Sequence, residues 1–261
     1  MESDQPAGIM PGAEPLRIER GRPRACLLFH GWLSSPADFG ELPEALDRAG
    51  WDVSAPLLPG HGTAYEDLDG VRADDLLAAA RAHYRALAAR HEEVVLGGFS
   101  MGGTIATILA AERAPSRLVL IAPYYGVAQK WYYVLPVPWW VAILSPLVGH
   151  VVAFRSWLQL NDRSRLDRIV CYRRFAVSSA KELMELQRIA VERSDLSGMT
   201  MPTLMVYSRG DEVVCPLAME RFMRRLPARQ KQEAVFTRSN HHLLHDYDRD
   251  EAVRAIVGFL G

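Results

Sequence analysis

The sequence predicts an α/β protein in which a mostly parallel central sheet is flanked by helices and carries an inserted cap. Short apolar runs of strand type alternate with longer runs of helical periodicity along most of the chain. Strands separated by helices are joined by right-handed crossovers, which produces parallel pairing and helices on both faces of the sheet. The alternation stops over residues 124–199 and then resumes, which is typical of an insertion between two core strands.

The predicted strands are short, apolar and bounded by turn residues. In chain order they are Ala25–Phe29, Trp51–Ala55, Glu93–Gly98, Leu118–Ile121, Thr203–Tyr207 and Gln232–Phe236. The predicted helices place apolar residues three or four positions apart, as Leu76, Ala80 and Tyr84 do. In chain order they are Asp38–Ala49, Asp74–Arg90, Thr104–Arg113, Leu217–Arg225 and Asp250–Leu260. We therefore assign residues 16–123 and 200–261 to one core and residues 124–199 to the cap.

The composition is that of an ordinary globular protein. The chain has 261 residues, of which 49% are hydrophobic and 23% charged, and its formal net charge is −1. A charge so close to zero argues against a nucleic-acid-binding surface and provides no attraction to anionic lipid. We therefore expect no nucleic-acid partner.

The cysteines and the N-terminal residues bear on the compartment. Cys26, Cys171 and Cys215 are odd in number and far apart, so we expect neither a disulfide framework nor a metal site. The N-terminal residues have neither the basic nor the apolar segment of a secretory signal. We expect a cytoplasmic protein whose residues 1–15, rich in Pro, Gly and Ala, form a flexible tail.

Ser100 lies between a predicted strand and a predicted helix, in the stretch Gly98-Phe99-Ser100-Met101-Gly102. A serine flanked by glycines at such a turn is typical of a nucleophile elbow, in which the serine backbone is strained and the glycines let strand and helix approach closely. The helix that follows directs N–H groups and partial positive charge toward a developing oxyanion. The simpler interpretation is a serine that only caps the helix, so the assignment of a nucleophile depends on its partners.

A serine nucleophile needs a base, and the base needs an acid that orients it. In folds with this turn, the acid and the histidine follow the serine along the chain. Asp211, in a turn just past the predicted strand Thr203–Tyr207, is the candidate acid; the alternative is an ordinary turn aspartate. His241, at the apex of the loop after the last predicted strand, is the candidate base, and its neighbour His242 is the alternative.

The oxyanion of such a reaction needs N–H donors. One candidate is the backbone N–H of Met101, the residue after the serine. The second is the backbone N–H of Trp32, in the loop that follows the strand Ala25–Phe29, where Gly31 permits a tight turn. We expect His30, at the start of this loop, to anchor it rather than to transfer protons.

The cap is aromatic, and its run from Trp131 through Phe154 contains no Asp, Glu, Lys or Arg. That run is long enough to span a bilayer, but Pro136, Pro138 and Pro146 cut it into short pieces. We therefore expect its aromatic side chains to line an apolar cavity; the alternative is that they only pack the cap on the core. Because Trp and Tyr favour a lipid interface, weak peripheral contact with a membrane is a further expectation. The aromatic residues on which these predictions for the cap rest are Trp131, Tyr132, Tyr133, Trp139, Trp140 and Trp157.

Several of these stretches together resemble a known family. They are Leu27–Trp32, Pro56–Gly62, Gly98–Gly103, Gly210–Val214, and Ser239–His241 followed by Asp246–Asp248. Over residues 16–123 and 200–261 the chain resembles the α/β-hydrolase superfamily, and within it the bacterial carboxylesterases and monoacylglycerol lipases. That group places its histidine two residues after a serine and five before an aspartate, which supports His241 over His242.

The resemblance implies a serine hydrolase that cleaves a small-molecule carboxylic ester, such as an apolar acyl ester or a monoacylglycerol, through an acyl-enzyme. Ser100 would attack the ester carbonyl, His241 would take the proton and Asp211 would hold the imidazole; no metal or cofactor is implied. The same triad also serves carbon–carbon bond hydrolases and cofactor-free haloperoxidases. A non-catalytic protein that only binds a ligand is the alternative from another class.

Overall fold

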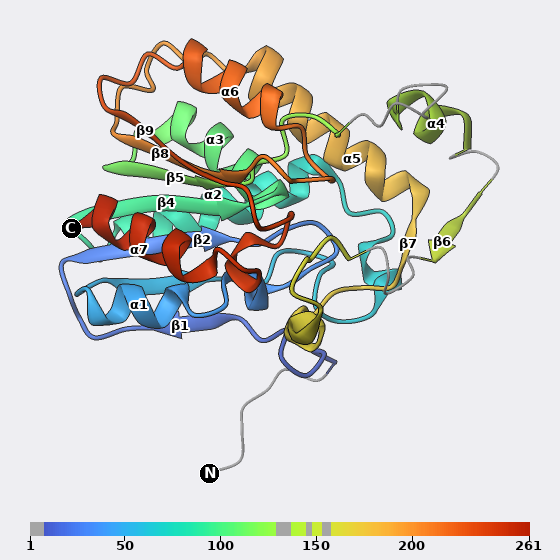
Figure 1. The fold of residues 1–261 in the computed structure, drawn as a ribbon, viewed down its shortest axis with the longest axis horizontal. Coiled ribbons are helices and arrows are strands. Elements are labelled where there is room, and N and C mark those ends of the chain that lie inside the picture. The colour runs from blue at the N-terminus through green and yellow to red at the C-terminus, as the bar shows by residue number, and fades with distance from the viewer. Residues whose placement is uncertain (1–7, 129–136, 145–147, 153–157) are drawn as a thin grey trace.

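The fold is described from a computed structural model, for residues 8–128, 137–144, 148–152 and 158–261 (Figure 1). The main feature of these residues is a seven-stranded sheet with the order β1-β3-β2-β4-β5-β8-β9. Its strands are β1 (Leu16–Ile18), β2 (Arg24–Phe29), β3 (Asp52–Ala55), β4 (Glu93–Phe99), β5 (Arg117–Ile121), β8 (Thr203–Ser208) and β9 (Lys231–Phe236). Neighbouring strands are parallel except for β1 and β3, which are antiparallel. The predicted α/β class with a mostly parallel sheet is confirmed.

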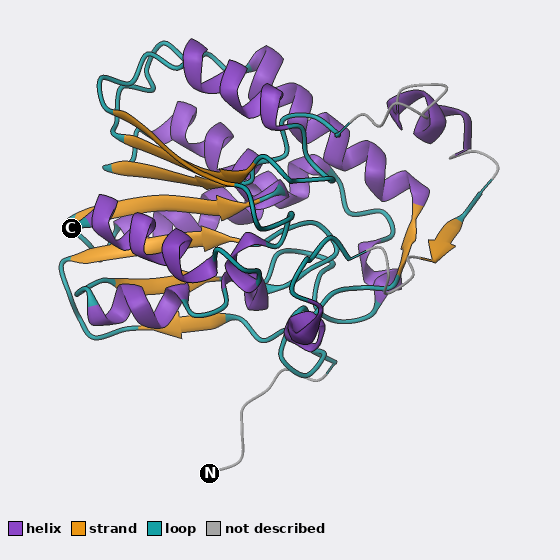
Figure 2. Cartoon of the chain, in the orientation of Figure 1, coloured by secondary structure: helices purple, strands orange, loops and turns teal. Residues whose placement is uncertain are grey.

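Helices cover both faces of the sheet, as the purple helices on either side of the orange strands show (Figure 2). The core helices are α1 (Leu42–Arg48), α2 (Ala73–Ala88), α3 (Met101–Arg113), α6 (Pro216–Arg225) and α7 (Arg249–Leu260). On the face toward the viewer in Figure 1, α1 and α7 pack against each other. On the far face, α2 and α3 pack against each other.

Within the core, the structure corrects one predicted helix and adds one strand to the central sheet. Where the sequence predicts a helix over Asp38–Ala49, the chain forms a 3₁₀ helix at Pro36–Phe39, turns at Gly40 and begins α1 at Leu42. The φ angle of Gly40 is 52°, a left-handed conformation that ends the 3₁₀ helix. The edge strand β1 was not predicted because its three residues are too few to show alternation.

The serine turn lies at the centre of the sheet because β4 and α3 meet there. Every residue of α3 from Met101 to Ala110 is buried. The small residues Gly102, Gly103 and Ala106 permit this depth, since they let the helix approach the strands closely. In open parallel sheets the ligand site lies beyond the carboxyl ends of the strands, and the N-terminus of α3 is at that edge.

Between β5 and β8 the chain leaves the sheet and forms a separate group of elements. They are α4 (Val137–Leu144), β6 (His150–Val152), β7 (Arg174–Ala176) and α5 (Val177–Arg188). β6 and β7 form a two-stranded antiparallel sheet of their own. Figure 1 shows α4, β6 and β7 beyond the ends of the core strands, and α5 packs on α2 and α3. Four of the aromatic residues that carried the cap prediction lie outside the described residues: Trp131, Tyr132, Tyr133 and Trp157.

Residues 1–7 of the predicted tail also lie outside the described residues. Farther along, the Met10 N–H donates a hydrogen bond of 2.7 Å to the Gly62 carbonyl, and Ala13 is fully buried. This part of the predicted tail therefore packs on the core. Among the described helices, none is both long enough and apolar enough to cross a bilayer.

Candidate active site

Ser100 occupies a strained turn between β4 and α3. Its φ of 53° and ψ of −116° lie in a region that residues with a side chain rarely adopt. The neighbouring glycines are needed, because a Cβ on Gly98 would lie 2.2 Å from the backbone of Gly102. A Cβ on Gly102 would lie 1.8 Å from the carbonyl oxygen of Phe29. The close approach of strand and helix that the sequence predicts is therefore present.

The structure brings Ser100, His241 and Asp211 into one hydrogen-bonded series. The His241 Nε2 atom lies 3.0 Å from the Ser100 Oγ, and the His241 Nδ1 atom lies 2.7 Å from an Asp211 carboxylate oxygen. All three residues are buried. Because a carboxylate only accepts hydrogen bonds, the ring proton belongs on Nδ1, which leaves Nε2 free to accept the serine hydroxyl.

Asp211 is held by its own turn after β8. Its second carboxylate oxygen accepts the backbone N–H groups of Val213 and Val214 at 2.8 and 2.9 Å. Both oxygens of the carboxylate are therefore occupied, one by the imidazole and one by the turn. This arrangement fixes the direction in which the carboxylate faces the histidine.

The histidine loop is tied to the acid loop and to the segment that follows β6. The Asn240 side-chain oxygen accepts the N–H groups of Glu212 and His241 at 3.0 and 2.9 Å. Asp246, fully buried, accepts the N–H groups of Asn240 and Asn161, each at 2.8 Å. Asp246 explains one of the spacings that carried the family resemblance, because its carboxylate holds the backbone beside the histidine.

His242, the alternative base, lies in a different environment. Its Nδ1 atom is 3.8 Å from a carboxylate oxygen of Asp38 and has no hydrogen-bond partner among the described residues. Burial, together with the nearby His241, holds the pKa of His242 well below its usual value. The series of hydrogen bonds to Ser100 runs through His241, so the geometry supports His241 as the base.

The loop after β2 carries Trp32 and is anchored by His30. The His30 Nδ1–H donates to the Gly31 carbonyl at 2.9 Å, and its Nε2 accepts the Leu58 N–H at 3.0 Å. Burial lowers the pKa of His30 to about 3, so the ring is neutral and uses one nitrogen as donor and the other as acceptor. Met101, the other candidate donor, is the first residue of α3, where no preceding helical carbonyl is available to its N–H.

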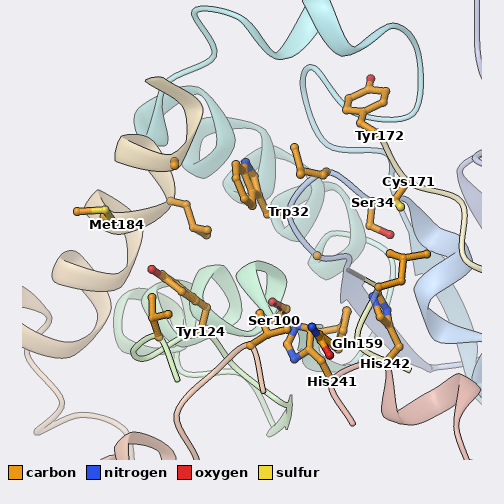
Figure 3. Close-up of a pocket in the computed structure, with 18 of the residues that line it drawn as sticks. Trp32, Ser34, Ser100, Tyr124, Gln159, Cys171, Tyr172, Met184, His241 and His242 are labelled. Carbon is orange, nitrogen blue, oxygen red and sulfur yellow. Dashed lines mark hydrogen bonds between the residues drawn. The ribbon is translucent and has the colours of Figure 1, made fainter. Parts of the chain in front are cut away.

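A cavity of about 350 Å³ opens beside Ser100 and His241 (Figure 3). In Figure 3 Trp32 lies across from Ser100, with Tyr124 and Met184 on one side and Cys171 and Tyr172 on the other. The lining is mostly apolar and comes from the core and from the segment between β5 and β8. Its apolar members are Trp32, Leu33, Phe99, Tyr124, Val127, Val141, Leu158, Tyr172, Ala180, Leu183, Met184 and Val213.

Two of the aromatic residues that carried the cap prediction, Trp139 and Trp140, are described, and neither lines this cavity. Trp139 and Trp140 of α4 are 62% and 41% exposed, and the cavity wall contains Val141 of that helix instead. Leu183 and Met184 of α5 are part of the apolar wall, and the sequence interpretation missed them. The signal available for them was the helical spacing of Ala180, Leu183 and Met184, at positions i, i+3 and i+4.

No group of three or more His, Cys, Asp or Glu side chains among the described residues is arranged to hold a metal ion.

The sheet order, the strained serine turn and the cavity at the carboxyl edge define an α/β-hydrolase. A model of the serine aminopeptidase S33 family matches residues 21–248, and the chain belongs to this family. The expected class, a hydrolase of the lipase and esterase type, is confirmed.

Two curated relatives match nearly the whole chain. A thermostable monoacylglycerol lipase of Bacillus sp. (strain H-257) is 28% identical over 257 residues, which cover 96% of this chain and 95% of the relative. A carboxylesterase of Bacillus subtilis (strain 168) is 22% identical, covering 92% of this chain and 94% of the relative. The predicted resemblance to these two groups is therefore confirmed.

Solved structures show the same fold. A structure reported for the metagenome-derived lipolytic enzymes LipS and LipT superimposes with a TM-score of 0.85 at 24% identity, covering 97% of this chain and 98% of that one. The monoacylglycerol lipase of Paleococcus ferrophilus superimposes with a TM-score of 0.76 at 19% identity, covering 95% and 98%.

Proposed function

We propose that the protein hydrolyses carboxylic esters with an apolar acyl group, monoacylglycerols among them, by a Ser-His-Asp triad. The observation that carries this proposal is the hydrogen-bonded series Ser100–His241–Asp211 at the wall of an apolar cavity. Two of the relatives, one named a monoacylglycerol lipase and one a carboxylesterase, support the substrate class.

The geometry of this series supports the following reaction. Ser100 Oγ attacks the ester carbonyl while His241 Nε2 takes its proton, and Asp211 stabilises the imidazolium that forms. The N–H groups of Met101 and Trp32 bind the oxyanion of the tetrahedral intermediate. His241 then gives the proton to the leaving alcohol, and water repeats the sequence on the acyl-enzyme. No metal or cofactor takes part in these steps.

The elements between β5 and β8 form the cap of this site, which we assign to residues 124–199. Its helix α4 exposes Trp139, Trp140 and Ile143, the last of them 46% exposed. Such side chains are stable at the boundary between lipid and water. We include in the proposal that this face of the cap makes weak contact with a lipid surface, where acyl esters are found.

Labelling with a fluorophosphonate and turnover of esters test the proposal together. We expect rapid labelling of the wild type, none of Ser100→Ala, and hydrolysis of a p-nitrophenyl ester and of a monoacylglycerol. Labelling without turnover of any ester would favour the carbon–carbon bond hydrolase or haloperoxidase chemistry. Absence of labelling would favour a protein that only binds its ligand.

Flotation with phosphatidylcholine vesicles tests the lipid contact separately. We expect a fraction of the wild type to float, and less of a Trp139→Ser/Trp140→Ser variant. Hydrolysis of a water-soluble short-chain ester should be the same in both proteins, because neither side chain lines the cavity. Equal flotation of the two proteins would contradict the role of α4.

A further inference from the structure

We propose that Asp38 is a positioning residue that holds the loop Gly31–Ser34 so that the Trp32 N–H faces the oxyanion. This inference rests on the proposed function, because it assigns a role to Asp38 within the same reaction. Asp38 lies on the 3₁₀ helix Pro36–Phe39 and does not line the cavity. It therefore acts through the loop and not on the substrate.

The Asp38 carboxylate bridges the two ends of this loop. One oxygen accepts the Gly31 N–H at 2.8 Å, and the other accepts the Ser34 hydroxyl at 2.6 Å. Both bonds are buried, so water does not compete for them. Trp32, the candidate oxyanion donor, lies between the two bonded residues.

Gly31 is the residue whose conformation matters most for the Trp32 N–H. The Gly31 carbonyl and the Trp32 N–H belong to one planar peptide group and point in opposite directions. His30 binds that carbonyl at 2.9 Å, while Asp38 binds the N–H on the other side of Gly31. A glycine is otherwise free to rotate, so the two hydrogen bonds together set the direction of the Trp32 N–H.

Two unfavourable features at this place point to a functional requirement. Asp38 is a buried carboxylate with no lysine or arginine ion pair among the described residues, and burial raises its pKa to about 6. Leu33, next to Trp32, has a φ of 63°, in the left-handed region. Strain and buried charge of this kind persist where the surrounding structure maintains them, and they concentrate at functional sites.

The test separates positioning from stability. The Ser100 oxygen adds to the carbonyl carbon of a trifluoromethyl ketone. The adduct carries a negatively charged oxygen at the position where the oxyanion of the ester reaction forms. We expect Asp38→Ala to lower kcat for p-nitrophenyl butyrate about 10- to 100-fold and to raise the Ki of this ketone by a similar factor. KM should change little, since no cavity contact is removed. Asp38→Asn keeps an oxygen that accepts the Gly31 N–H, so it should restore most of both losses.

Asp52 provides the matched control. Its side chain is also buried and accepts the N–H groups of Arg20, Gly21 and Arg22, but it lies at the start of β3, at the end of the sheet opposite to Ser100. Asp52→Ala should lower the thermal midpoint without changing kcat or the Ki of the ketone.

Unchanged kcat and Ki in folded Asp38→Ala would overturn the inference and leave Asp38 a structural residue. Should that variant not fold, Ser34→Ala carries the test: it removes one of the two bonds, and we expect a several-fold loss of kcat with a similar rise in the Ki of the ketone. Unchanged kcat in Ser34→Ala would then count against the inference. Ser100→Ala, measured in the same series, distinguishes this failure from a failure of the proposed function, because its residual activity bears on the nucleophile alone.

Discussion

The Nδ1 atom of His241 lies 2.7 Å from the carboxylate of Asp211, although the two residues belong to separate loops after the neighbouring strands β8 and β9. Parallel pairing of these strands places both loops at the same edge of the sheet. The same contact fixes the ring tautomer, and that in turn directs Nε2 to Ser100. Replacing Ser100, His241 or Asp211 should therefore change ester hydrolysis in a different way for each residue.

Replacement of Ser100 by alanine should reduce ester hydrolysis by several orders of magnitude, because the attacking oxygen is lost. The thermal midpoint should change little, since the backbone of the turn is held by its N–H bond to the Ile121 carbonyl and not by the side chain. Steady-state rates and thermal melts check both parts. A pure Ser100→Ala protein with a tenth of the wild-type rate would rule out this nucleophile.

His241→Ala should lose far more activity than His242→Ala in the same ester assay. The first removes the group 3.0 Å from the serine oxygen, whereas His242 contacts Phe99 and lies near Asp38. Added imidazole should partly restore His241→Ala and leave His242→Ala unchanged. A larger loss of activity in the His242 variant would indicate that His242, and not His241, is the base.

Asp211→Asn should lower kcat roughly 100- to 10,000-fold, with a smaller effect on KM. An asparagine can present its amide nitrogen to His241 Nδ1, which favours the tautomer with the proton on Nε2 and removes the acceptor that the serine needs. Asp248→Asn is the control, because Asp248 supports the same loop through Ser239 and makes no bond to the imidazole. Equal losses in the two variants would indicate that Asp211 acts only through the fold.

Acyl chain length should control kcat/KM. Each methylene buried in the apolar cavity contributes about 0.8 kcal/mol, or roughly fourfold, so p-nitrophenyl esters should improve from acetyl toward octanoyl. Met184→Lys should flatten this profile, because it brings a charge to the cavity wall. A profile that is already flat in the wild type would point to a small polar ester as the substrate.

The raised pKa of Asp38 should make the stability of the protein depend on pH. Its pKa is raised by burial from 3.8 to about 6, so the folded protein binds more protons than the unfolded chain between these values. The free energy of unfolding therefore falls as the pH rises through this window, by about 3 kcal/mol for this group. The charged or titratable side chains around it, His241, His242 and Cys171, are unchanged in Asp38→Asn.

Thermal melts of the wild type and of Asp38→Asn at pH 4 and pH 8 check this expectation. The variant should gain stability relative to the wild type as the pH increases, since it has no carboxylate to ionise. A difference between the two midpoints that is the same at both pH values would contradict the raised pKa.

The sequence predicted the parts of this protein that depend on neighbouring residues. The strands and helices of the core follow from apolar periodicity over short windows. The serine turn follows from the glycines near Ser100, at positions where a side chain would collide with the backbone. Gly40 shows the limit of this reasoning. It interrupts a run that otherwise looks helical, because its left-handed backbone is settled by packing under Leu244.

Contacts between distant residues were decided by the tertiary structure alone. His241 reaches Ser100 across 141 positions of the chain. The sequence indicates the pair only by placing both residues after predicted strands, and resemblance to a family is what favoured His241 over His242. Asp38 could not be recognised from the sequence, since a carboxylate at the start of a predicted helix resembles any solvated side chain; its contacts with Gly31 and Ser34 appear only in the folded chain. The composition of the cavity wall was likewise decided by packing: Trp139 and Trp140 of α4 are exposed, whereas Leu183 and Met184 of α5 line the cavity. Periodicity identifies the apolar face of a helix, but only the packing of the whole chain determines what that face meets.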